Sequence, residues 1–401
     1  MGREPARRFG SISGSCASFD PRGPGARSPR RTDARRRGRL PRRVLHNAGM
    51  FTPDRSRADP AALHALGTTL ASLAELTDDV GPWRSGSFAA LADSGLLAGF
   101  IPADCGGVAA AESALLTALA AIAERCLTTA LAVSQWASAC RIIAGGSAEL
   151  RAARLPGLAR GQTPTTVGIS QLSTSRRHLS APALTASADG DGWRLDGVCP
   201  WVTGADSCDT IVTGAVTAEG ERLFFVVECT ARGLEIGRPL PLVALSGSRT
   251  SSVRFRAVAP ADVIVPAADG GVRTGGLATT ALALGSSRAA VGIVAREAVP
   301  RAALEPVASG LRDEADDIAM HLDHMARLGG DPAERDRLRA RATSLAVRAA
   351  QAALTASKGA GFVAGHPAAR LVRESLFFLV WSCPESVSAA VMCELAGLAG
   401  D

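Results

Sequence analysis

The chain has 401 residues, 47% of them hydrophobic and 20% charged, and its formal net charge is +6. A chain of this length and apolar content can bury a sizeable core, which excludes a fully disordered protein and predicts two or three structural layers or domains. The nine cysteines form no Cys-x-x-Cys pair and no Cys/His ligand spacing, so we expect reduced thiols and no metal site.

Positive charge is concentrated at the start of the chain. Residues 1–49 hold 13 arginines against three acidic residues, a net charge of +10 that leaves −4 for the rest. The segment is rich in Gly, Pro and Ser and lacks apolar periodicity, so we expect a disordered basic arm. We interpret it as non-native or overextended sequence rather than a transit peptide, and expect no specific nucleic-acid partner. Because no stretch of about 18 uninterrupted apolar residues occurs, we also expect no membrane partner and a cytoplasmic location.

A helical pattern runs from about residue 61 to residue 159. Its apolar residues follow the helical period in segments 63–76, 87–100 and 111–146. The last segment is small and apolar nearly all round, which is typical of helices buried between others. Asp59 and Pro60 open the first segment as a cap and a first-position proline. We predict an N-terminal helical domain over residues 50–163.

Short strands replace helices in the middle of the chain. Alternating and β-branched segments, separated by Gly, Asp and Pro turns, run from Thr165 to Val265. The ADGDG turn at 188–192 is rich in residues that tolerate positive φ and predicts a hairpin. We predict a small antiparallel β-domain over residues 164–270.

Helical periodicity returns from about residue 275, in segments 279–299, 313–328, 334–358 and 370–382. Within it, Asp317, His321 and His324 share one helix face, a pattern more often found on a solvated face than in a metal site. We predict a C-terminal helical bundle over residues 271–401, which makes the fold class α+β.

Two clusters in the β region have the chemistry that a flavin needs. Ile169-Ser170 and Trp201-Val202-Thr203 combine an apolar or aromatic wall with hydroxyl groups, as a flat ring with a polar rim requires. Three flanking segments carry further motifs. Residues 91–107 hold a predicted helix followed by a loop with Pro and Gly-Gly, and residues 233–266 hold a Gly-Ser-Arg-Thr turn before a closing Val-Pro. Residues 359–378 hold Gly-x-Gly followed by Arg-Glu. In this order the motifs resemble the acyl-CoA dehydrogenase family, from about residue 61 to the end.

The resemblance implies an acyl-CoA dehydrogenase-like fold with FAD as cofactor. It implies that Ile169 and Ser170 contact the pyrimidine edge of the flavin. It also implies that Trp201 stacks near the dimethylbenzene or central ring and that Thr203 forms a hydrogen bond near N5. Trp201 and Thr203 lie two apart on a predicted strand, so their side chains are expected on the same side of the sheet.

The chain departs from the family pattern at several binding positions. Gln171 stands where the family usually has Glu, and Arg176, our predicted substrate-binding residue, stands near the serine that approaches the substrate. The family's Arg-x-x-Phe-Gly segment has no counterpart, which leaves Arg296 and Arg301 as alternative phosphate partners or as solvated surface charges.

The catalytic base departs most from the family pattern. The family draws a Glu from a Glu-Gly-Thr triplet, and the corresponding position is Ser382. Because a serine hydroxyl is too weakly basic to act unaided, we consider Glu385, three residues further on, as a substitute base. His366 is a second alternative, and a reaction that needs no base is the third.

We therefore predict an FAD-dependent oxidoreductase for CH–CH donors, acting on an acyl thioester or a related small substrate. The alternatives are a flavin-dependent monooxygenase or oxidase of the same fold, and a catalytically silent relative that binds acyl groups or a protein. The resemblance implies a homodimer or homotetramer, since the family completes its cofactor site between subunits, and an electron-transfer flavoprotein as a partner.

Overall fold

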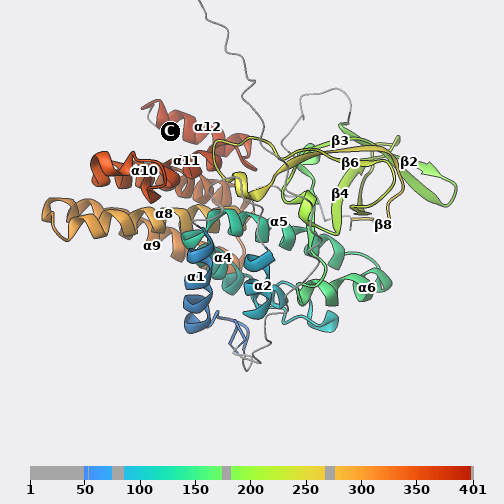
Figure 1. Ribbon diagram of the computed structural model, residues 1–401, viewed down its shortest axis with the longest axis horizontal. Helices are drawn as coiled ribbons and strands as arrows, with labels where there is room; N and C mark the ends of the chain where they lie inside the picture. Colours follow the sequence, from blue (N-terminus) through green and yellow to red (C-terminus); the bar gives the residue numbers. More distant parts are fainter. Residues whose placement is uncertain (1–48, 53, 75–84, 174–181, 267–275, 399–401) are drawn as a thin grey trace, which may run out of the picture. The chain divides into compact units, whose positions relative to one another are not determined.

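The computed structural model describes residues 49–52, 54–74, 85–173, 182–266 and 276–398 (Figure 1). The predicted basic arm, apart from Gly49, and the predicted substrate residue Arg176 lie outside the described residues.

Helices make up the first described region, as predicted. They are α1 (Pro60–Ala74), α2 (Ser85–Asp93), α3 (Leu96–Gly99), α4 (Glu112–Arg125), α5 (Leu127–Ala144) and α6 (Ala148–Ala159). The predicted start of α1 is confirmed: Pro60 is its first residue, and the Asp59 carboxylate accepts a hydrogen bond from the Ala61 amide at 3.0 Å. This contact satisfies one of the amides that a helix start leaves without a partner.

The predicted segment 111–146 is two helices rather than one. Cys126 has extended backbone angles, φ −153° and ψ 100°, and separates α4 from α5. The side chain of Thr129 donates a hydrogen bond to the Cys126 sulfur at 3.2 Å. Small and apolar residues continue on both sides of Cys126, so the hydrophobic pattern does not reveal this break.

The middle of the chain forms one eight-stranded sheet in the order β6-β7-β3-β2-β4-β5-β8, with β1 paired to β4. The strands are β1 (Thr165–Gly168), β2 (Leu184–Asp189), β3 (Gly192–Val202), β4 (Thr210–Val216), β5 (Arg222–Glu228), β6 (Leu234–Ile236), β7 (Ser251–Val258) and β8 (Asp262–Ile264). The predicted hairpin is confirmed, since β2 and β3 pair antiparallel up to Asp189 and Gly192. The sheet is not wholly antiparallel, because β4 pairs in parallel with β1 and, at one residue pair, with β2.

The sheet has apolar residues buried on both faces. Along β5, Phe224 and Val226 join the core shared with the helices, while Leu223, Phe225 and Val227 join a second core within the β region. Successive strand residues point to opposite faces, so a continuous apolar run is what a strand buried on both faces requires.

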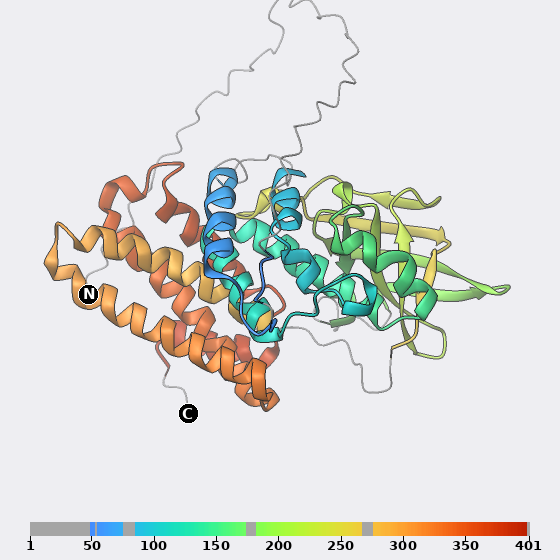
Figure 2. The ribbon, with the colours of Figure 1, turned by 90° about the horizontal axis from the view of Figure 1, so that it is seen from below.

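The chain ends in a second set of helices (Figures 1 and 2). They are α8 (Leu277–Ala298), α9 (Glu305–Leu328), α10 (Pro332–Gly361), α11 (Pro367–Ser375) and α12 (Glu385–Leu395). The last of these was not predicted from the sequence. A 3-10 turn, Leu376–Leu379, follows α11. Among the described helices, α8 alone is long and apolar enough to cross a membrane, but 78% of that stretch is buried inside the fold.

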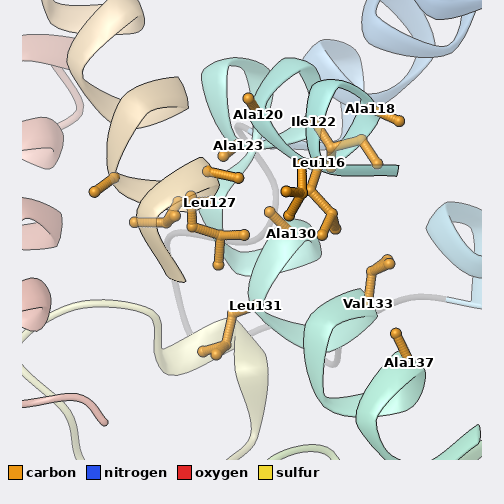
Figure 3. Packing of buried hydrophobic residues seen from close by; sticks show 14 of the residues in the cluster. Leu116, Ala118, Ala120, Ile122, Ala123, Leu127, Ala130, Leu131, Val133 and Ala137 are labelled. Carbon is orange, nitrogen blue, oxygen red and sulfur yellow. The ribbon is translucent and has the colours of Figure 1, made fainter. Parts of the chain in front are cut away.

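Small residues let α8 approach α4 closely. A Cβ placed on Gly285 of α8 would lie 2.2 Å from the carbonyl oxygen of Ala120 and 2.7 Å from the Ala123 Cβ. Figure 3 shows Ala120 and Ala123 among the buried side chains of α4. No side chain larger than hydrogen fits at Gly285, so the two backbones are in direct contact.

Candidate active site

A cavity of about 920 Å³ lies between the sheet and the two sets of helices. Its wall includes five of the residues predicted from the sequence to act in binding or catalysis: Ile169, Ser170, Trp201, Thr203 and Ser382. The volume lies in the range of small-molecule and cofactor sites, roughly 300–1,000 Å³. Residues more than 200 positions apart in the sequence therefore meet at one site.

The sheet contributes a flat aromatic surface to this cavity. Trp201, the penultimate residue of β3, is 48% exposed and lines the cavity. Thr203 follows the end of β3, lines the same cavity and is buried. The β3–β7 register shifts between Cys199 and Val202, and such irregularities redirect the side chains beside them. Both residues line the same cavity, although Thr203 lies just beyond the end of the strand on which it was expected.

The Thr203 hydroxyl belongs to a chain of hydroxyl groups. It lies 3.2 Å from the Thr250 hydroxyl, which lies 2.9 Å from that of Ser248. The carbonyl of Thr203 accepts a hydrogen bond from the Thr166 hydroxyl at 2.8 Å. Because Thr250 also lines the cavity, these contacts hold two hydroxyl groups at the cavity surface.

The Ile169-Ser170 cluster begins where β1 ends. The four-residue helix α7 (Ser170–Ser173) starts there, and packing fixes this junction: a Cβ on Gly168 would lie 2.9 Å from both the Cys199 sulfur and a Val202 methyl group. Burial raises the pKa of the Cys199 thiol to about 12. The thiol therefore stays protonated at neutral pH and acts as a packing group behind the cavity.

The opposite wall comes from the segment that follows α11. Phe377 and Trp381 stack with ring centroids 4.9 Å apart and an interplanar angle of 17°, and both line the cavity. Ser382 follows with φ +49°, in the left-handed region. A residue other than glycine pays roughly 1–2 kcal/mol for that conformation. The surrounding structure must therefore hold this turn in place.

Arg339 of α10 lies directly behind that turn. It is 1% exposed and donates hydrogen bonds at 3.4 Å to the carbonyls of Phe378 and Trp381. Its guanidinium also lies 5.6 Å from the centre of the Phe378 ring. Its Nε and Nη1 have no hydrogen-bond partner among the described residues. Burial lowers the pKa of this guanidinium to about 10.

Comparisons with known proteins agree with this architecture. Residues 68–162 match the sequence model of the acyl-CoA dehydrogenase N-terminal domain. Among solved structures, the chain is similar to glutaryl-coenzyme A dehydrogenase in complex with glutaryl-CoA, at 16% identity and a TM-score of 0.74 over 84% of this chain and 94% of that one. It is also similar to butyryl-CoA dehydrogenase from Megasphaera elsdenii, at 17% identity and a TM-score of 0.69 over 84% and 96% of the two chains.

The chain has the acyl-CoA dehydrogenase fold. The resemblance drawn from its motifs and the predicted order of helices, sheet and helices are both confirmed. A third similar structure is KijD3 in complex with FMN and dTDP-3-amino-2,3,6-trideoxy-4-keto-3-methyl-D-glucose, at 21% identity and a TM-score of 0.66 over 86% of this chain and 96% of that one. A search of curated proteins found no match.

In this acyl-CoA dehydrogenase-like chain the two predicted base positions are in different environments. Ser382 lines the cavity, whereas Glu385 is the exposed first residue of α12 and is not among the residues that line it. His366 caps α11, where its Nδ1 accepts a hydrogen bond from the Ala368 amide at 3.1 Å. The roles predicted for Ser382 and Glu385 stay predictions.

The remaining charged candidates of the acyl-CoA dehydrogenase-like chain lie away from the cavity wall. Arg296 is exposed near the end of α8, and Arg301 forms an ion pair with Glu297. Asp317 accepts a hydrogen bond from Arg341 at 2.6 Å and lies 3.4 Å from His321. These contacts give Arg301 and Asp317 structural partners within the helical bundle.

Three charged residues of the cavity wall were not singled out from the sequence: Glu112, Arg141 and Arg335; a fourth, Arg373, was noted only as the arginine of the Arg-Glu motif. Glu112 opens α4, where an acidic residue is usually explained by the helix dipole. One signal could have found it, because Glu112 falls at i, i+3, i+4 and i+7 with three leucines that also line the cavity. The cavity of this acyl-CoA dehydrogenase fold therefore carries more positive than negative side chains among the described residues.

Proposed function

We propose that the protein is a flavin-dependent oxidoreductase that holds FAD against Trp201 and binds a small substrate between the flavin and the Phe377–Trp381 pair. The observation that carries the proposal is that one cavity joins Ile169, Ser170, Trp201 and Thr203 to the Ser382 turn. A flat, half-exposed indole beside buried hydroxyl groups fits a ring with apolar faces and a polar rim. Arginines in the same wall would suit the phosphates of a dinucleotide.

The chemistry expected of the chain's own residues follows from this arrangement. A bound flavin supplies a hydride acceptor at N5. The Thr203 hydroxyl would orient the ring edge, and the aromatic walls would exclude water from the reacting carbons. The backbone amide of Ser382 would polarise a substrate carbonyl.

Removal of an α-proton from a thioester is the step that this chain supports least. By the spacing of the motifs, Ser382 corresponds to the family's Glu, and it lines the cavity. A serine hydroxyl cannot take that proton unaided. General bases typically contribute about 10²–10⁴-fold in rate. We therefore expect slow α,β-dehydrogenation of simple acyl-CoA substrates, unless Glu385 supplies the base after a local rearrangement.

The second candidate function is an oxygen-using flavin monooxygenase or oxidase, favoured by Ser382 because such a reaction needs no α-proton abstraction. KijD3, one of the similar structures, was solved with FMN and a nucleotide-linked sugar, which is not a thioester. The third candidate, a silent acyl- or protein-binding relative, differs from both in taking up no flavin.

Assembly and electron transfer are parts of the same proposal. We infer a cytoplasmic homodimer or homotetramer that passes electrons either to an electron-transfer flavoprotein or to oxygen. Support for an interface comes from apolar side chains exposed after α10, where Phe362 is 84% and Val363 is 62% exposed. Patches of this kind commonly mark sites of association.

One experiment separates the three candidates. The purified protein is incubated with FAD or FMN, desalted, and its visible spectrum recorded. The flavin-loaded protein is then mixed with butyryl-CoA without oxygen, with and without an electron-transfer flavoprotein, and separately reduced and exposed to oxygen. Bleaching by butyryl-CoA supports the dehydrogenase, and substrate-dependent oxygen consumption supports the oxygenase. A colourless protein after incubation with either flavin contradicts both.

A further inference from the structure

The cavity wall formed by α4 and α5 changes character along its length. Each helix lines the cavity along one face, since the lining residues recur at helical spacing: Leu119, Leu116, Leu115 and Glu112 on α4, and Leu131, Ser134, Gln135, Ser138 and Arg141 on α5. The two helices meet at Cys126. Leu131, labelled in Figure 3, lies one turn from that junction, whereas Glu112 is the first residue of α4 and Arg141 lies in the last turn of α5, at the far ends of the two helices.

The polar side chains of α5 offer acceptors to a ligand. The Ser134 hydroxyl donates its hydrogen to the Leu131 carbonyl at 2.7 Å, and the Ser138 hydroxyl donates to the Ser134 carbonyl at 2.8 Å. The Gln135 amide nitrogen donates to the Ser134 hydroxyl oxygen at 3.2 Å. A hydroxyl carries a single hydrogen, so the Ser138 oxygen keeps only lone pairs for a ligand, and the Gln135 carbonyl is an acceptor.

Glu112 adds a negative charge to this set of acceptors. It is the sole carboxylate among the described residues that line the cavity. Its side chain forms no ion pair or hydrogen bond with any other described residue, although arginines line the same cavity. An ionised carboxylate is an acceptor only. Glu112 is exposed and its charge is favoured by the helix dipole at the start of α4, so the carboxylate oxygens are available to a ligand.

We propose that this cavity takes a small molecule with a short apolar part and a protonated amine, and that the amine binds Glu112 and the acceptor oxygens of α5. An alkylammonium carries three donors, one positive charge and no acceptor, which complements Glu112 and the acceptor oxygens of Ser138 and Gln135; Arg141, at the far end of α5, is the cation of this wall that the amine has to avoid. A purely aliphatic acyl chain would instead desolvate Glu112 without giving it a partner. The proposal deepens the proposed function, on which it rests for the flavin on the opposite side of the substrate.

The test compares two probes that differ only in the head group, n-hexylamine and n-hexanol. Each is titrated into the flavin-loaded protein while the flavin spectrum and tryptophan fluorescence are recorded. Because a hydrogen bond to a charged group contributes roughly 1.5–3 kcal/mol, we expect hexylamine to bind about 10-fold or more tightly than hexanol. Glu112→Gln should abolish this preference.

A matched control separates recognition from effects on the helix start. Glu149→Gln also removes an acidic residue from the first turn of a helix, α6, at an exposed position outside the cavity wall. It should keep the preference for the amine. Melting curves of both variants check that each remains folded.

The same titrations are repeated on flavin-free protein, with binding measured by calorimetry. They distinguish the proposed flavin-dependent function from the proposed amine site at Glu112. A protein that takes up no flavin but keeps an amine preference dependent on Glu112 contradicts the proposed function and supports this inference. Equal binding of the two probes, a preference that survives Glu112→Gln, or no saturable binding of hexylamine in either form overturns it.

Discussion

The side-chain amide of Gln171 donates a hydrogen bond to the backbone carbonyl of Gly214, 2.8 Å away. The same nitrogen lies 3.3 Å from the carbonyl of Gly168, and the amide oxygen accepts from the Cys199 thiol at 3.1 Å. Gln171 thereby joins β1, β3 and β4 behind the cavity. Gln171, which the motif resemblance aligns with the family's usual Glu, thus supports the sheet in this chain.

We expect Gln171→Glu to destabilise the protein, because a buried carboxylate would replace a donor and face two carbonyl oxygens. An uncompensated buried charge costs on the order of 3–5 kcal/mol. Denaturant unfolding measures the change, and part of the loss should be recovered at about pH 5, where a buried glutamate with a raised pKa is protonated. Gln162→Glu, at an exposed position, is the matched control; an equal loss there would contradict the explanation.

Trp201→Ala should remove flavin binding with little loss of stability. The side chain is half exposed at the cavity, so truncation forfeits only part of the usual aromatic burial, about 1 kcal/mol. Trp193→Ala is the matched control and should have the opposite effects on stability and flavin binding. Because Trp193 packs edge-on against the buried Phe225, its truncation should lower stability and leave flavin affinity unchanged. Flavin titration and melting curves report both quantities. Retention of flavin by Trp201→Ala would refute the assignment of this wall.

Ser382→Glu should increase bleaching by an acyl-CoA in the absence of oxygen, because it places a base at the cavity wall. A gain of up to about 10²–10⁴-fold is the usual contribution of a general base. Glu385→Gln in the unmodified background tests the substitute base. Loss of activity there assigns the role to Glu385, and fast bleaching that survives it would mean that the motif alignment at this terminus is wrong.

Arg339→Met should change stability by less than about 2 kcal/mol, because this buried charge has no carboxylate partner in the part of the chain that the structure describes, and its replacement relieves the desolvation. It should nevertheless loosen the 376–382 segment, whose carbonyls Arg339 holds. Faster amide exchange at Val380 and Trp381, with unchanged exchange in α4, is the expected readout. A loss above about 4 kcal/mol would show that the charge itself stabilises the bundle.

Much of the fold could be predicted from the sequence because its elements have strong periodicity. The helix starting at Pro60, the hairpin at 188–192 and the return of helices near residue 277 follow from capping, turn chemistry and spacing. The break at Cys126 could not be predicted, because it interrupts no hydrophobic pattern. The parallel pairing of β1 with β4 depends on contacts between residues far apart in the sequence.

The site was predictable where a motif carries its own chemistry. Trp201 and Thr203, which the resemblance to a flavin-binding motif pointed to, both line the cavity. Glu112 and Arg339 were not predictable, since one looks like a helix-start acid and the other like a surface arginine until tertiary packing places them. Gln171 shows a further limit: its position suggested cofactor binding, while its hydrogen bonds lie within the sheet.

Gly285 determines which parts of the cavity can adapt to a substrate. With no side chain between them at Gly285, the backbones of α8 and α4 are in direct contact, so the two helices cannot slide independently. Leu277 at the start of α8 and Leu116 on α4 both line the cavity. The helical side of the cavity is therefore a rigid wall, and it limits the size of the substrate that can bind. The opposing side of the cavity has no such backbone contact among the described residues: it is formed by the 242–245 loop and by the turn ending at Ser382, whose carbonyls are held by the Arg339 side chain.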